Sequence, residues 1–280
     1  MKNSARLLAL MAVGLVLFSA TGCDKLRARD QLNKGVASYK SAKYEEAIDH
    51  FQQSVSLDPN LVVARMYLAT AYAQQFIPGV DAPDNTRMGE QAIEQYKHVL
   101  ETTASKELQI NSNKGIAYIY LNMKKFDDAK TYYRKAQELD PNDPEPYYSV
   151  GVIDWTQTYQ PRMEARAKLG LKPEESLNGK DKEQKKVCMD LKEKNLPIVQ
   201  DGIDGLNKAL QIRPDYDDAM AYMNLLYRER ADVECDDPAA RASDLKTADD
   251  WVDKTMAAKK AKAEKQPGVQ GITLDPNTAK

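Results

Sequence analysis

Residues 35–59 read GVASYKSAKYEEAIDHFQQSVSLDP, and this stretch decides the fold. Small residues stand where two helices would touch closely, and large rings stand where the space between helices must be filled. These positions are Gly35, Tyr39, Tyr44, Ala47 and Phe51. Pro59 then ends the unit, because proline stops a helix. The stretch therefore predicts two short helices packed against each other.

The same frame returns farther along the chain, at Ala117, Tyr120, Phe126, Ala129, Tyr133, Ala136 and Pro141. Pro141 aligns with Pro59, and these two positions are 82 residues apart. Two repeats of about 34 residues leave about 14 residues over, so the unit between them must carry insertions. A fourth unit begins at Asp143, an N-cap, followed by Pro144 at the first helical position. A fifth runs through Met223 and Trp251.

This frame resembles the tetratricopeptide repeat (TPR). The resemblance implies an all-α fold, a right-handed superhelical solenoid of about five degenerate helix-turn-helix units with insertions. We expect the solenoid to occupy residues 24–256, with units of about 28–61, 62–107, 110–143, 144–216 and 217–256. The chain departs from the repeat consensus at Gly202 and Asn224 and in its long insertions, which leaves the helix boundaries open.

The resemblance also implies a groove lined by the first helix of each unit. Transferred to this chain, the groove positions give a partner-binding set of Tyr39, Met66, Tyr67, Tyr118, Tyr148, Trp155, Tyr222 and Arg228. Tyrosine and tryptophan bury a large area and keep a polar tip, so they suit the anchoring of a partner helix or extended peptide. The alternative for each ring is core packing, since an aromatic stripe at helical spacing is often core.

Three insertions, residues 76–91, 156–200 and 229–243, each fall between the two helices of their own unit. We expect them to line one edge of the solenoid and to add to partner specificity; the alternative is lengthened helices or neutral loops. Cys188 and Cys235 lie in two of these insertions. They can form a disulfide in an exported protein, or remain two separate thiols.

The N-terminus predicts export. Lys2 and Arg6 precede an apolar run, residues 7–18, that is too short to favour a permanent membrane span. Residues 20–23, Ala-Thr-Gly-Cys, resemble a bacterial lipobox, which implies a signal peptide over residues 1–22, cleavage before Cys23 and lipidation of Cys23. The alternative is ordinary cleavage near Gly22. We expect a protein anchored at the periplasmic face of the inner or outer membrane.

Little in the sequence favours catalysis or nucleic-acid binding. The chain has a net charge of −2 and two histidines, whereas nucleic-acid binders normally carry a basic domain or stripe. No phosphate-binding loop, nucleophile elbow or His-Glu-x-x-His motif occurs. We therefore expect no enzyme, no cofactor and no metal site. Residues 257–280 are charged and are expected to be a disordered tail.

Together these features favour a non-catalytic scaffold or adaptor at a bacterial envelope membrane. It would bind a protein or peptide in an aromatic-lined groove and along a loop-decorated edge. One alternative is an enzyme subunit or small-ligand-binding protein that uses residues 156–200. The many lysines and carboxylates there predict solvated helix or loop, with no apolar run able to build a pocket. A self-associating structural protein is the other alternative.

Overall fold

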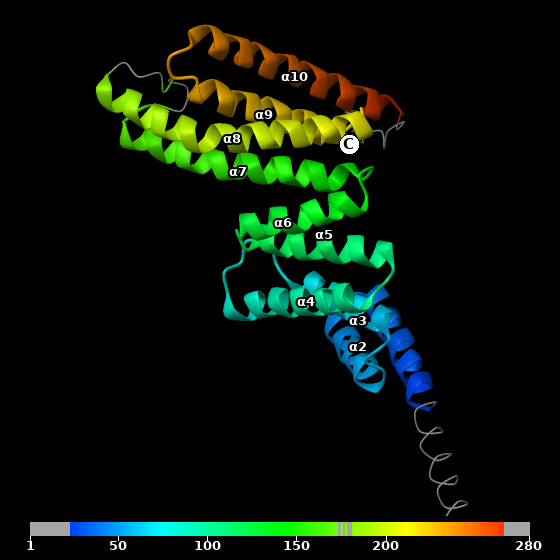
Figure 1. Cartoon of the computed structure of the whole chain (residues 1–280). Coiled ribbons are helices and arrows are strands. Elements are labelled where there is room, and N and C mark those ends of the chain that lie inside the picture. Colours follow the sequence, from blue (N-terminus) through cyan, green and yellow to red (C-terminus); the bar gives the residue numbers. More distant parts are fainter. Residues whose placement is uncertain (1–22, 173–174, 176, 178–180, 266–280) are drawn as a thin grey trace, which may run out of the picture. The chain divides into compact units, whose positions relative to one another are not determined.

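The computed structural model describes residues 23–265 except 173, 174, 176 and 178–180, and the regular structure of these residues is helical, which confirms the all-α prediction (Figure 1). A helix over residues 23–40 comes first. The helices that follow are α2 (Tyr44–Leu57), α3 (Val62–Gln75), α4 (Pro83–Thr102), α5 (Lys106–Asn122), α6 (Phe126–Leu139), α7 (Pro144–Lys168), α8 (Lys182–Ile212), α9 (Asp217–Val233) and α10 (Pro238–Lys265).

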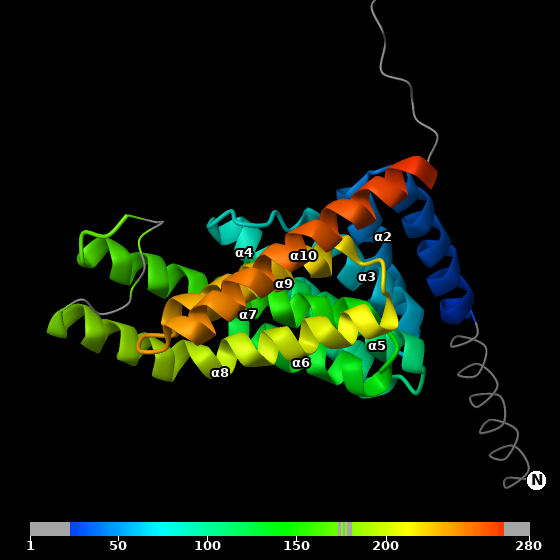
Figure 2. The same cartoon turned by 90° about the horizontal axis from the view of Figure 1, so that it is seen from above.

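The chain divides into two compact units, at Asp140 and Pro141. In the first unit each of the helices α2 to α6 packs on the next, and α3 also contacts α5. In the second unit α7 packs on α8, α8 on α9 and α9 on α10, and α7 also contacts α9; these helices lie side by side in both Figure 1 and Figure 2. The contact between alternate helices brings the first helix of one pair beside the first helix of the next.

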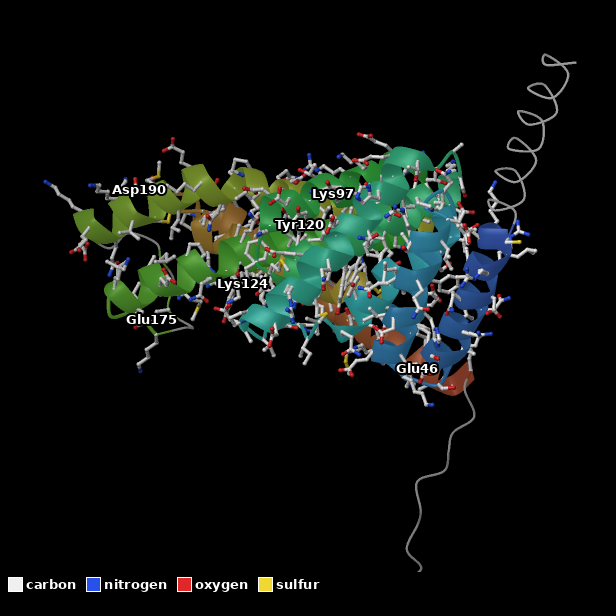
Figure 3. All side chains as sticks on the ribbon, turned by 90° about the horizontal axis from the view of Figure 1, so that it is seen from below. Glu46, Lys97, Tyr120, Lys124, Glu175 and Asp190 are labelled. Carbon is white, nitrogen blue, oxygen red and sulfur yellow. A yellow bond between two sulfur atoms is a disulfide. The ribbon has the colours of Figure 1, made fainter. Side chains whose placement is uncertain are left out.

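The same kind of turn joins the helix over residues 23–40 to α2, the first helix pair, and α5 to α6, the third helix pair. Ala42 and Lys124 are 82 residues apart in the chain, and both adopt the left-handed conformation, with φ of 58° and 59°. In each turn the next residue's N–H, that of Lys43 or Lys125, bonds to a carbonyl five residues back, at 3.0 and 2.9 Å. This is a Schellman cap. Lys124 is labelled at its turn in Figure 3.

Small residues lie where the two helices of a pair touch, as the sequence predicts. A Cβ added to Gly35 would lie 2.5 Å from the ring of Phe51, and one added to Gly151 would lie 2.6 Å from Leu206. Phe51 and Leu206 are fully buried. A methyl group at either glycine would therefore push the helices apart.

The three insertions are largely lengthened helices, not long loops. α4 begins at Pro83, inside the first insertion, and the Asn85 side chain bonds to both the N–H and the carbonyl of Ile77 to hold the short loop before it. In the second, α7 continues to Lys168 and α8 begins at Lys182. In the third, α9 continues to residue 233 and α10 begins at residue 238.

The prediction of disorder from residue 257 is wrong for the first part of that segment. α10 continues to Lys265, because Thr255 is buried against its neighbours and the Lys262 ammonium donates a hydrogen bond to the Asp217 carboxylate of α9. The predicted signal peptide, residues 1–22, and the tail beyond residue 265 lie outside the described residues.

Candidate partner-binding surface

Aromatic rings from α7 and α9 make one continuous strip in the second unit. Tyr148 and Trp155 lie two turns apart on α7 and therefore on one face of that helix. Tyr222 of α9 contacts both, with ring centroids 5.7 Å from Tyr148 and 5.6 Å from Trp155. Tyr216 extends the strip at the Tyr148 end, at 4.9 Å, and Tyr159 extends it at the Trp155 end, also at 4.9 Å. We call these five rings the aromatic strip.

The rings of the strip carry polar tips as well as apolar faces. Among the described residues, none forms a hydrogen bond with the hydroxyl of Tyr148, Tyr216 or Tyr222, or with the indole N–H of Trp155. Burial raises the pKa of the Tyr148 hydroxyl, and Tyr222 and Asp218 nearby raise it further. Since burial also raises the pKa of Tyr216 and Tyr222, these hydroxyls stay protonated at neutral pH and can both donate and accept.

The predicted groove rings of the first unit pack against its core, as rings of the strip pack against the core of the second unit. Tyr67 stacks on Phe51 of α2, with centroids 5.5 Å apart, and Tyr39 packs edge-on against Tyr44 at 5.3 Å. Both rings fill space between helices and pack against the hydrophobic core. For Tyr39 and Tyr67 the structure therefore places the side chain in inter-helix packing.

The other two predicted groove positions of the first unit, Met66 and Tyr118, differ in their exposure to solvent. Met66 packs against the core, and its sulfur accepts a hydrogen bond from the Ser112 hydroxyl of α5 at 3.6 Å. Tyr118 is 44% exposed. Of the four positions predicted in this unit, Tyr118 alone is an exposed ring.

The Arg228 side chain is exposed but forms hydrogen bonds with two neighbouring side chains. Its guanidinium bonds to Asp249 of α10 at 2.7 Å and to Asn224, one turn back on α9, at 2.9 Å. This explains the departure from the repeat consensus at Asn224, whose amide oxygen orients Arg228. Arg228 is thus positioned by α10 and stands apart from the aromatic strip in its contacts.

Buried ion pairs join the C-terminal part of α7 to α9. Arg162 of α7 bonds through two nitrogens to both carboxylate oxygens of Glu229, each at 2.7 Å, and through its third nitrogen to Asp232 at 2.7 Å. Arg166, one turn on, also bonds to Asp232, at 2.8 Å, and to the Lys172 carbonyl. The side chains of Arg162, Arg166 and Glu229 are each less than 10% exposed.

A disulfide completes this fastening. Cys188 of α8 is joined to Cys235, just after α9, with the two Cα atoms 5.8 Å apart. Beside it, Lys192 of α8 forms an ion pair with Glu234 at 2.7 Å. We call this region, with the ion pairs of Arg162 and Arg166, the stapled end.

Residues 156–200 are largely helix with many exposed side chains, as expected, but they also contribute to a small core that the sequence did not predict. Leu177 and Cys188 are fully buried and pack with Leu191, Val233 and Cys235. A depression of about 360 Å³ between α7 and α8 has an apolar floor that includes Leu191 and a rim of charged side chains. Figure 3 shows two residues of this region, Glu175 in the connecting loop and Asp190 on α8. The sequence signal for this small core is the isolated leucines that stand between charged residues.

The described residues contain no group of three or more histidine, cysteine or acidic side chains that could hold a metal ion. His50 bonds to Gln31 at 2.7 Å, and His98 lies 3.4 Å from Glu101. Both histidines are thus accounted for by local contacts. In the same part of the chain, no helix has the length and apolar content that crossing a membrane requires.

Comparison with known families identifies two of the helix pairs. Two family profiles, both described as tetratricopeptide repeat, match residues 28–61 and 111–143. The chain contains tetratricopeptide repeats. The two matched TPR segments are the first and third helix pairs, which share the left-handed turn at Ala42 and Lys124. The remaining pairs are also two successive helices each, and α4, α7, α8 and α10 are longer than the helices of the matched segments.

Solved structures agree on the TPR fold. The crystal structure of MamA protein is 14% identical to this chain, with 86% of this chain and 96% of that chain covered and a TM-score of 0.55. MamA from residue 41 to its end, from Desulfovibrio magneticus RS-1, is also 14% identical, covers 84% and 96% of the two chains and has a TM-score of 0.54. At this identity the likeness is one of fold. No curated protein sequence matches the chain.

Proposed function

We propose that this TPR protein is a non-catalytic adaptor that holds a segment of a partner protein on the aromatic strip. The observation that carries the proposal is a row of touching rings, Tyr148, Tyr222 and Trp155 at its centre, whose polar tips have no hydrogen-bond partner within the described residues. Rings of this kind supply apolar area at low side-chain entropy cost, and their hydroxyl and indole groups can bond to the backbone of a bound segment.

The position of the strip supports the same function. A solenoid repeat contacts its neighbours and leaves an extended surface along its first helices, and the strip runs along α7 and α9, the first helices of two successive pairs. An extended peptide or an amphipathic helix can lie along such a surface. The stapled end joins the same two helices to α8 and is a fixed edge that can add to specificity.

We further propose that the chain is exported and that Cys23 carries a lipid. Cys23 is exposed, is not in a disulfide and lies at the start of the helix over residues 23–40, so its thiol is accessible to modification. The Cys188–Cys235 disulfide supports export, because disulfides persist in oxidising compartments such as the periplasm and are rare in the cytosol. The choice between inner and outer membrane is left to experiment.

The binding proposal is tested by crosslinking from the strip. A photo-crosslinking phenylalanine derivative replaces Tyr222 in one variant and Tyr132 in a control variant. Tyr132 of α6 is also half-buried and in ring contact, with Tyr120 of α5, but is not part of the strip. We expect a defined envelope protein to be captured from Tyr222 and not from Tyr132. Equal capture from both positions, or none from Tyr222, would refute the assignment of the strip.

A second experiment tests the anchor separately. The full chain is expressed in a Gram-negative host with a labelled fatty acid, as wild type and as Cys23→Ala. We expect label on the wild type and none on the variant. An unlabelled wild type found in the soluble periplasmic fraction would instead support ordinary cleavage and would leave the strip experiment unaffected.

A further inference from the structure

The end of α10 is tied to the start of α9, next to the outer ring of the aromatic strip. The Lys262 ammonium donates a hydrogen bond to the carboxylate of Asp217, the first residue of α9. Asp217 directly follows Tyr216, whose ring lies 4.9 Å from that of Tyr148. α10 ends at Lys265, about 5 Å farther along the helix axis. The chain therefore leaves α10 at the end of the second unit where α9 begins (Figure 1), near the Tyr216 end of the strip.

The segment that follows α10 differs in composition from the last turns of that helix. Residues 257–265 contain no apolar residue larger than alanine, whereas residues 266–274 read QPGVQGITL and include Val269, Ile272 and Leu274. The segment carries no charged side chain. Its proline and two glycines disfavour a helix, so its sequence suits recognition as an extended peptide. We call residues 266–274 the tail segment.

The tail segment is long enough to lie along the aromatic strip. Tyr148 and Trp155 are seven positions apart on α7, which corresponds to about 10 Å along the helix axis. An extended chain spans up to about 3.3 Å per residue, so nine residues reach up to about 30 Å. The segment can therefore pass Tyr216 and still place two of its apolar side chains over the central rings.

We propose that the tail segment occupies the aromatic strip of its own chain when no partner is bound, with Ile272 and Leu274 against the rings of Tyr148 and Tyr222. The proposal rests on the proposed function in one respect, namely that the strip binds an extended segment. Ile272 and Leu274 supply apolar area for the rings, and the tyrosine hydroxyls can bond to the backbone of the segment. The tail segment is thus an internal competitor of the partner.

Covalent attachment makes weak contacts sufficient. A segment held beside its site has an effective concentration of about 1 mM, so a dissociation constant of about 0.2 mM leaves most copies of the strip occupied. A partner that needs the free strip then binds with an apparent Kd raised about six-fold. Removing the tail segment should restore the intrinsic affinity.

The test uses the purified chain from residue 24 onward, produced under oxidising conditions, with a photo-crosslinking phenylalanine derivative in place of Tyr222. Crosslinked peptides are identified by mass spectrometry. The test variant is Ile272→Asp with Leu274→Asp, and the control is Asn277→Asp with Thr278→Asp, which adds the same charge beyond the tail segment. Mixing chains labelled with ¹⁵N and unlabelled chains separates crosslinks within one chain from those between two. Circular dichroism verifies that both variants fold.

We expect the main crosslink to join position 222 to residues 266–274 of the same chain. Its yield should fall at least about ten-fold in the Ile272/Leu274 variant, which loses the apolar contacts, and should stay within about two-fold in the control. No crosslink to the tail segment, crosslinks that join two chains, or an equal loss in both variants would overturn the proposal.

A second measurement separates this proposal from the proposed function. A chain that ends at Lys265 should capture the envelope protein from position 222 about six-fold more efficiently at limiting partner concentration. Equal capture with and without residues 266–280, together with no crosslink to the tail segment, would refute the occupied strip and leave the adaptor function supported. A crosslink to the tail segment with no envelope protein captured by either chain would refute the adaptor function and support the occupied strip.

Discussion

The buried ion pairs of the stapled end make a prediction that can be worked out from the structure. Arg162 is the guanidinium that neutralises Glu229, whose side chain is only 3% exposed. In Arg162→Met the apolar volume is largely kept, but Glu229 is left buried without its counter-charge. Breaking a buried pair in this way costs about 3–5 kcal/mol. Asp232 retains its bond to Arg166 at 2.8 Å, so the loss is confined to Glu229.

The penalty should depend on pH in a defined direction. Burial raises the pKa of Glu229 above its ordinary 4.5, and Arg162 partly opposes that rise. Removing Arg162 therefore raises the pKa further. A carboxyl group with a raised pKa in the folded state binds more protons folded than unfolded, so its contribution to stability falls as pH rises through that pKa. The cost of Arg162→Met is thus greatest at neutral pH and decreases as the pH falls toward 4.5.

Urea unfolding followed by tryptophan fluorescence measures this directly. Both tryptophans of the chain, Trp155 and Trp251, lie in the second unit, so the signal reports that unit. The double variant Arg162→Met with Glu229→Gln should recover most of the lost stability, because no buried charge remains unpaired. Lys246→Met, which breaks an exposed pair, is the control and should have no measurable effect. A loss below ~1 kcal/mol at neutral pH, or one that is the same at pH ~5 and ~7, would refute this reasoning.

Three further predictions concern the fold. Replacing Cys188 and Cys235 by alanine should lower the stability of the second unit by up to about 4 kcal/mol, as urea unfolding with and without reductant would show. Ala42→Gly should stabilise the first unit by about 0.5–1 kcal/mol, because glycine adopts the left-handed turn without strain; an unchanged or lower midpoint would contradict this. Gly151→Ala should cost about 1–3 kcal/mol through its contact with fully buried Leu206, measured as a lower urea midpoint.

Local rules predict much of this fold. The Asp143-Pro144 start of α7 is confirmed, with the Asp143 carboxylate accepting a hydrogen bond from the Glu145 N–H at 3.0 Å. The extent of α7 is not predictable in the same way, since Pro161 lies inside it, where proline costs about 3 kcal/mol. Tertiary contacts offset that cost, among them the ion pair that Arg162 makes one residue later. These partners come from residues about 70 positions away, which no local pattern shows.

The candidate surface is likewise only partly predictable from the sequence. The repeat register identifies rings on first helices, and three of them, Tyr148, Trp155 and Tyr222, contact one another through Tyr222. It does not show how far each ring also fills space between helices: Tyr67 stacks on Phe51, and Tyr148, Trp155 and Tyr222 pack against the core of the second unit. The outer rings of the strip have no position in the repeat frame, since one precedes α9 and the other lies in an insertion.

The aromatic strip and the stapled end are joined through Tyr159. Its ring contacts Trp155 at 4.9 Å, and the guanidinium of Arg162 lies 5.3 Å from the centre of the same ring. The bidentate pair that fixes Arg162 to Glu229 thus also fixes the end of the strip. Rings held in place before a partner arrives lose less conformational entropy on binding. If the strip binds a partner as proposed, the lengthened helices of residues 156–200 would preorganise that surface as well as stabilise the second unit.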